Sequence, residues 1–292
     1  MSPVTVRAAA KINLHLGVGA ARPDGFHPLD TVYQAVSLHD EVTVERADDW
    51  SLEMTTAEYV DAGDIPLDDS NLVTRAAGLL GGGAATVSIR KRIPVAGGMA
   101  GGSADAAATL VALDRLWGVL TPPQRMAELA AELGSDVPFA LVGGTARGVG
   151  RGEVVDPVDD PGGWWWVVVP AAVGLSTPEV YRRFDQLRPD AGEPTPSDAV
   201  LRALTSADPA LLAQALHNDL QPAALDLRPE LAEVIAAGEA AGALRGLVSG
   251  SGPTCVFLCS DEASAEVVAA DLRGSYAVVL MARGPVPGAV GP

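Results

Sequence analysis

Cysteine, lysine and aromatic residues are scarce in this 292-residue chain, and no apolar run reaches membrane-spanning length. The two cysteines, Cys255 and Cys259, lie in one apolar, β-branched stretch, which favours packed thiols over a disulfide or a metal site. The longest nearly apolar run, residues 162–175, contains Pro170 and is shorter than the roughly 20 residues that a span needs. No signal-peptide pattern opens the sequence, so we expect a cytoplasmic protein.

Positive charge is also in short supply, with 20 Lys and Arg residues against 37 Asp and Glu residues and a net charge of −17. This excess of negative charge repels nucleic acids and anionic lipids at long range, which argues against both as partners. An anionic small molecule would therefore have to be held by local groups. With 48% apolar residues, the chain can bury the core of one large domain or two ordinary ones.

Only two of the 20 basic residues are lysines. Lys91 stands between Arg90 and Arg92, and we interpret it as the solvated end of a strand. Lys11 instead interrupts a largely apolar pattern that predicts strands over residues 4–10 and 12–18. A lysine snorkelling from a strand edge and a functional cation both remain open for Lys11.

Hydrophobic periodicity predicts strands and helices in alternation, which is typical of an α+β architecture. The pattern restarts after the acidic, proline-containing segment 156–161, so we place a domain boundary near residue 155. The further strands are expected at 32–38, 41–46, 85–93, 164–169, 255–258 and 276–282, and the helices at 71–80, 104–117, 122–133, 178–187 and 261–272.

A glycine-rich loop, Pro94–Ser103, follows one predicted strand and opens a predicted helix. Glycine lets backbone N–H groups approach a ligand closely, and a helix start favours anions, so the loop can cradle phosphate. The simpler interpretation is a tight turn with Ser103 as the helix N-cap. The loop has neither the Gly-Lys-Ser/Thr of a P-loop nor the βαβ setting of a dinucleotide site.

Three blocks, residues 10–14, 94–104 and 249–254, occur in the order seen in the GHMP kinases, and the chain resembles that superfamily. Its members phosphorylate small-molecule alcohols such as homoserine, mevalonate and galactose. Segments 24–27 and 134–139 resemble the branch that acts on cytidine diphospho-methylerythritol in the non-mevalonate isoprenoid route. The resemblance implies transfer of the ATP γ-phosphoryl group to the 2-hydroxyl of that substrate, with Mg²⁺ accompanying ATP.

The resemblance also implies a two-domain α+β GHMP kinase fold. An N-terminal ATP-binding domain, similar to ribosomal protein S5, would span residues 1–155. A ferredoxin-like C-terminal domain would span residues 156–292. Oligomeric state is not predicted.

The family's site residues map onto matching positions of this chain. Lys11 and Asp136 match the catalytic pair, although Asp136 alone could equally be a turn residue at a helix end. Ser103 and Asp136 are the candidates for contact with Mg²⁺, and no metal ligand is assigned. The expected ATP-binding residues are Pro94, Val95, Ala96, Gly97, Gly98, Met99, Ala100, Gly101, Gly102, Ser103 and Ala104, and the expected substrate-binding residues are Asn13, Phe26, His27, Thr177 and Tyr181.

Two positions depart from the family pattern. Ala100 stands where glycine is more common, which is tolerable if its φ stays negative, and Phe26 replaces a common tyrosine. The alternatives are a sister kinase of the homoserine or mevalonate type and a non-catalytic nucleotide-binding protein on the same fold. Retention of both Lys11 and Asp136 favours an enzyme.

Overall fold

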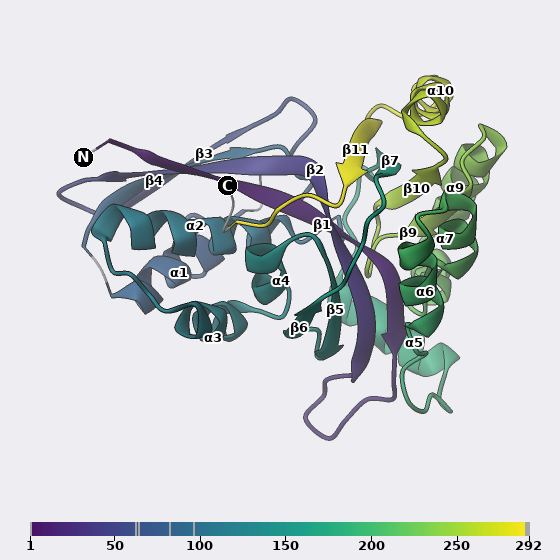
Figure 1. Ribbon diagram of the computed structural model, residues 1–292, viewed down its shortest axis with the longest axis horizontal. Coiled ribbons are helices and arrows are strands. Elements are labelled where there is room, and N and C mark those ends of the chain that lie inside the picture. Colours follow the sequence, from purple (N-terminus) through teal and green to yellow (C-terminus); the bar gives the residue numbers. More distant parts are fainter. Residues whose placement is uncertain (1, 62, 64, 82, 96, 290–292) are drawn as a thin grey trace.

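Two β-sheets organise the chain (Figure 1), whose computed structural model describes residues 2–61, 63, 65–81, 83–95 and 97–289. The larger sheet has seven strands: the order β3-β4-β2-β1-β8 forms its main path, β5 pairs with β2, and β6 pairs with β5. Its strands are β1 (Val4–Val18), β2 (Leu29–Arg46), β3 (Ser51–Thr56), β4 (Ala85–Lys91), β5 (Thr145–Gly150), β6 (Val154–Pro157) and β8 (His217–Asn218).

The first two strands are longer than the sequence pattern predicts. β1 and β2 have 15 and 18 residues and pair antiparallel, whereas each was expected as two shorter strands. The register shifts between Ala9 and Ala10 and again between Asn13 and His15. Such irregularities absorb a break in the hydrophobic pattern without ending the strand. Lys11 therefore lies within a continuous, buried strand.

Four helices pack with the large sheet: α1 (Leu72–Leu80), α2 (Gly101–Trp117), α3 (Pro123–Leu133) and α4 (Val137–Val142). α2 contacts both β1 and β2, and its many alanines let it approach them closely. The predicted helices at 71–80 and 122–133 are confirmed, and Asn71 caps α1 by accepting a 2.9 Å hydrogen bond from the Val73 amide. α2 begins at Gly101, three residues before the predicted start at 104, so Ser103 lies within the helix and the simpler interpretation of Ser103 as N-cap does not hold.

The second sheet has four antiparallel strands in the order β11-β7-β10-β9. Cys255 and Cys259 are buried and free on its strand β10, as predicted. The remaining helices gather on this side of the molecule (Figure 1). The elements are β7 (Trp164–Val169), β9 (Arg245–Val248), β10 (Cys255–Cys259), β11 (Leu280–Gly284), α5 (Thr177–Leu187), α6 (Asp198–Ser206), α7 (Pro209–Ala215), α8 (Gln221–Leu227), α9 (Glu230–Ala240) and α10 (Glu262–Leu272).

The tryptophan run on β7 joins the two sheets. Trp164 and Trp166 are fully buried, and the Trp166 indole donates a 2.9 Å hydrogen bond to the side-chain oxygen of Gln34 on β2. This placement confirms the expectation that the run packs in the core and at an interface. The final strand lies at Leu280–Gly284 rather than at 276–282. Within the described ranges, no helix has the length and apolar character needed to cross a bilayer.

Segments from both halves of the chain cross the predicted boundary at residue 155. Residue 155 lies within β6, which pairs with β5 in the large sheet, and the second sheet begins only at β7. β8 pairs in parallel with β1, and Gly143 bridges to Pro287 near the C-terminus. The division into residues 1–155 and 156–292 stays a prediction.

Candidate active site

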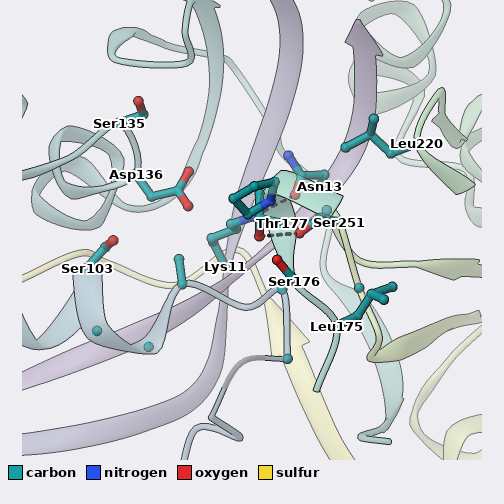
Figure 2. Close-up of a pocket in the computed structure, with 18 of the residues that line it drawn as sticks. Lys11, Asn13, Ser103, Ser135, Asp136, Leu175, Ser176, Thr177, Leu220 and Ser251 are labelled. Carbon is teal, nitrogen blue, oxygen red and sulfur yellow. Dashed lines mark hydrogen bonds between the residues drawn. The ribbon is translucent and has the colours of Figure 1, made fainter. Parts of the chain in front are cut away.

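One cavity of about 1050 Å³ collects most of the predicted site residues. Lys11, Asn13, Asp136 and Thr177 line it, and Figure 2 shows their side chains around a common space. Its wall also includes Phe26, His27 and Tyr181, together with Pro94, Val95, Gly97, Gly98, Ala100, Gly101, Gly102 and Ser103. Met99 and Ala104 are buried in the core instead, and Ala96 lies outside the described residues.

Lys11 is held at the cavity by a short polar chain. Its Nζ donates a 2.7 Å hydrogen bond to Asn13 Oδ1, and Asn13 Nδ2 donates a 2.8 Å bond to the Thr31 hydroxyl. The Thr31 hydroxyl in turn donates to the His15 carbonyl at 2.6 Å, so it can only accept from Asn13. This fixes the amide with its oxygen toward the lysine. Lys11 is only 7% exposed, and the partner of its ammonium group is a neutral amide. The positive charge is therefore available to a ligand.

Asp136 occupies the N-cap position of α4 but does not cap it. Its side chain accepts no capping hydrogen bond, and Figure 2 shows the carboxylate turned to the side of the cavity where Lys11 lies. Burial, and after it the nearby Asp136 carboxylate, raise the pKa of the Tyr33 and Tyr181 hydroxyls above the usual tyrosine value. The Tyr33 hydroxyl hydrogen-bonds this carboxylate, which keeps further lone pairs to accept a proton or a hydrogen bond from a ligand.

The glycine loop leaves the start of α2 open. No side chain caps the helix, and no acidic residue occupies its first turn. The first backbone N–H groups of α2, at the residues that line the cavity, are therefore not bonded by a side chain and can bind a ligand anion. Ala100 at the N-cap has φ 56° and ψ 34°, so the condition of a negative φ is not met. The alanine is held in the left-handed region that glycine adopts more easily.

The second glycine loop, residues 249–254, packs against the first. The Ser249 hydroxyl donates to the Gly98 carbonyl at 3.2 Å, and a Cβ at Gly98 would lie 2.2 Å from the Ser249 carbonyl oxygen. A Cβ at Gly250 would lie 3.2 Å from Lys11 Nζ. Ser251 shares a 2.8 Å hydrogen bond with Thr177. Close approach between the two loops and Lys11 explains why glycine is needed at these positions.

The far end of the cavity is aromatic. The rings of His27 and Tyr181 lie 4.9 Å apart, and the Phe26 side chain is 49% exposed at the same wall. Asp185 holds His27 through a 2.8 Å contact between its Oδ1 and the ring Nε2. These residues come from the loop after β1 and from α5, so folding brings together segments more than 150 positions apart.

Lys91 is not a solvated strand end, and that prediction is wrong. The residue is 2% exposed, and its Nζ donates hydrogen bonds to Asp40 and, at 2.7 Å, to Asp105. Burial alone would lower the pKa of Lys91, yet the Asp105 and Asp40 carboxylates raise it above the usual lysine value. Burial also raises the pKa of Asp105 to about 8, and the Asp40 carboxylate acts in the same direction. Lys91 thus bonds a buried pair of acids beneath the glycine loop.

Comparison with known proteins decides the family. The family model described as the GHMP kinases N terminal domain matches residues 71–144, and the GHMP kinases C terminal model matches residues 200–278. A Nocardioides protein named 4-diphosphocytidyl-2-C-methyl-D-erythritol kinase is 62% identical over 291 residues, 97% of this chain and 98% of that relative. The chain belongs to the GHMP kinase family. It is accordingly an ATP-dependent small-molecule kinase, and its α+β fold is the one expected.

Other relatives of this GHMP kinase agree. A Salinispora arenicola protein of the same name is 56% identical, with 98% of this chain and 94% of that relative covered. The crystal structure of a 4-(cytidine 5'-diphospho)-2C-methyl-D-erythritol kinase superposes with a TM-score of 0.79 at 33% identity, covering 96% of this chain and 98% of the other. The mevalonate kinase of L. major, at 16% identity and a TM-score of 0.75, shares the fold alone; 98% of this chain and 96% of that chain are covered.

Several cavity residues escaped the sequence analysis. Tyr33 lines the cavity with its ring centroid 5.7 Å from Lys11 Nζ, and Asp185 and Ser251 support His27 and Thr177. Tyr33 falls within a predicted strand and looks like a core aromatic. No pattern within its own segment distinguishes it from one, because its polar neighbours come from other elements.

Proposed function

We propose that this kinase transfers the γ-phosphoryl group of ATP to the 2-hydroxyl of 4-diphosphocytidyl-2-C-methyl-D-erythritol, a step in the non-mevalonate route to isoprenoid precursors. One observation carries the proposal: a single cavity joins the glycine loop, the Lys11–Asp136 pair and the aromatic end at Phe26 and His27. The names of the relatives point to the same substrate.

Asp136 and Lys11 are proposed to act on the acceptor hydroxyl. Asp136 accepts the hydroxyl proton or orients that hydroxyl toward the phosphoryl group. Lys11 stabilises the negative charge that spreads over the transferred group, and its neutral contact with Asn13 leaves that charge uncompensated by another acid. Asn13 lies beside Lys11 and is positioned to bond the polyol.

The aromatic end of the cavity is proposed to bind the cytidine moiety. Phe26 offers an exposed ring face, and stacking on an aromatic ring is worth roughly 1–3 kcal/mol per base in other systems. His27, oriented by Asp185, hydrogen-bonds the edge of the base. Tyr181, whose ring contacts that of His27, and Thr177 come from α5 and complete the wall of this end.

The glycine loop is proposed to hold the phosphates of ATP as its magnesium complex. A Cβ built on Gly102 would meet nothing within 4 Å, so space is open where phosphate oxygens would approach the backbone. Mg²⁺ usually binds phosphates, water and one or two protein oxygens. Ser103 and Asp136 both line the cavity and would supply such oxygens. We place the reaction in the cytoplasm, consistent with two buried, unpaired cysteines.

Measurement of ADP release with MgATP tests the proposal. The cytidine substrate is compared with homoserine and mevalonate at equal concentrations. We expect kcat/KM for the cytidine substrate to exceed both others by at least about 100-fold, because only that substrate fills the aromatic end. Preferred phosphorylation of homoserine or mevalonate would assign the chain to a sister branch. Binding of ATP without turnover of any acceptor would indicate a non-catalytic protein.

A further inference from the structure

The net charge of the protein creates a problem for the proposed substrate. A chain with a net charge of −17 repels a nucleoside diphosphate ester at long range, and the second ligand, ATP, is a polyanion as well. The glycine loop and Mg²⁺ are proposed for the phosphates of ATP, so guanidinium and ammonium groups inside the cavity are the candidates for the diphosphate. The question is which of them face the diphosphate rather than the transferred phosphoryl group.

Among the described residues that line the cavity, four carry a permanent positive charge: Lys11, Lys91, Arg151 and Arg182. Lys91 is already compensated by Asp40 and Asp105. Lys11 bonds Asn13 beside the proposed reaction centre. The two arginines are left, and neither has a role in the reaction described above.

Arg151 lies in the turn between β5 and β6, beside Phe26, on which the cytosine base is proposed to stack. Its guanidinium carbon is 4.9 Å from the centroid of the Phe26 ring. Its contact with Glu153 is loose, at 3.6 Å between Nε and Oε1, and 38% of the side chain is exposed. The guanidinium thus covers one face of Phe26 and keeps N–H donors available at its edge.

Arg182 follows Tyr181 on α5 and lines the same cavity. Its side chain makes no ion pair or hydrogen bond within the part of the chain that the structure describes. The next residue, Arg183, differs in this respect, because its Nε donates a 2.6 Å bond to Asp226 and it does not line the cavity. Two consecutive arginines on one helix are therefore distinguished by their partners.

We propose that Arg151, from the turn between β5 and β6, and Arg182, from α5, bind the diphosphate of the cytidine substrate. Planar guanidinium groups form charge-assisted, bidentate hydrogen bonds to phosphate oxygens, and these two flank the residues assigned to the base. The base uses the free face of Phe26 while Arg151 holds the other. This inference rests on the proposed function, because it presumes that the aromatic end binds cytidine.

The test separates the base from the diphosphate. Cytidine and cytidine diphosphate are titrated calorimetrically into wild type, Arg151→Gln and Arg182→Gln, with saturating ADP to occupy the ATP site. Charged hydrogen bonds to phosphate, discounted for solvent exposure, are expected to make each variant bind cytidine diphosphate about 5- to 20-fold more weakly. The affinity for cytidine should change no more than about 2-fold, because neither change removes the base contacts.

Arg183→Gln is the matched control, since it makes the same change in net charge one position along α5. It should leave the ratio of the two affinities unchanged. Raising the salt concentration should weaken cytidine diphosphate binding to wild type more than to either cavity variant. Thermal unfolding of each variant checks that the fold is intact.

The outcomes distinguish the inference from the function on which it rests. An unchanged affinity ratio in both Arg151→Gln and Arg182→Gln would overturn the arginine assignment while leaving the cytidine pocket in place. An equal drop in all three variants would reduce the effect to net charge and would also overturn it. Failure of wild type to bind both cytidine and cytidine diphosphate would contradict the proposed function itself.

Discussion

The two lysines of this protein share a place in the fold and differ in the side chains that they bond. Lys11 and Lys91 both lie on strands of the large sheet, are buried, and line the same cavity. Lys11 bonds the neutral amide of Asn13, whereas Lys91 bonds the acids Asp40 and Asp105. The partner therefore decides the role: the first ammonium can act on a ligand, and the second stabilises the protein.

Replacement of Lys11 by methionine gives the largest expected effect. Turnover should fall about 10³-fold or more, because a cation on the transferred phosphoryl group contributes on that scale in related chemistry. Stability should change little, since Lys11 loses one hydrogen bond at the edge of an open cavity. Turnover is measured by ADP release and stability by thermal unfolding. Activity within a few-fold of wild type would remove Lys11 from the mechanism.

Replacement of Lys91 by methionine should reverse that pattern. It leaves Asp40 and Asp105 buried without the ammonium that bonds both of them, which costs about 3–5 kcal/mol of unfolding free energy. Chemical denaturation measures this loss. Fully folded protein should retain most of its turnover per molecule. A variant as stable as wild type would show that these buried ion pairs do not stabilise the protein.

The Asp105→Asn variant sharpens the comparison through pH. The pKa of Asp105 is raised to about 8, so between pH 4 and 8 the folded state binds more protons there than the unfolded state. The contribution of this acid to stability is complete below about pH 4 and is lost as the pH rises through 8. Asn removes it, and one ammonium then faces the single acid Asp40.

Denaturation of wild type and Asp105→Asn at pH 5 and pH 8 measures the effect. The stability of wild type relative to the variant should fall over this interval. One oxygen of Asp105, Oδ1, has no hydrogen-bond partner among the described residues, as a group that is often protonated can tolerate. If the stabilities of wild type and Asp105→Asn changed equally between pH 5 and pH 8, the raised pKa of Asp105 would be contradicted.

The smallest effect is expected at Ala100. Glycine would relieve a left-handed conformation that costs about 1–2 kcal/mol for a residue with a Cβ, but it also increases the entropy of the unfolded chain by about 0.4–1 kcal/mol. Ala100→Gly should therefore raise stability by less than about 1.6 kcal/mol. Differential scanning calorimetry is sensitive enough to detect it. A clear loss of stability would mean that the alanine methyl group makes a packing contact that outweighs the strain.

The sequence predicts this fold and most of the residues that line the cavity, because both depend on motifs within short segments. The glycine loop, Lys11, Asp136 and Phe26 each belong to such a motif, and the cavity brings them together. The roles assigned to them stay proposals.

What the sequence does not predict are contacts between distant segments. Lys91 was misjudged because its partner Asp40 lies 51 positions away and gives no local signal. The positive φ of Ala100 is a property of the folded loop that hydrophobic periodicity does not show. Arg182 and Arg183 are the same residue type at adjacent positions, so the sequence does not distinguish them. In the structure Arg183 bonds Asp226, and Arg182 lines the cavity.

The central claim is that the cavity around Lys11 is a phosphoryl-transfer site in which Asp136 receives or orients the acceptor hydroxyl. Asp136→Asn tests it most directly, because the amide keeps the shape of the side chain and Asp136 does not cap α4. We predict a fall in kcat of about 10²–10⁴-fold, with ATP binding and thermal stability unchanged. Turnover within a few-fold of wild type would contradict the account.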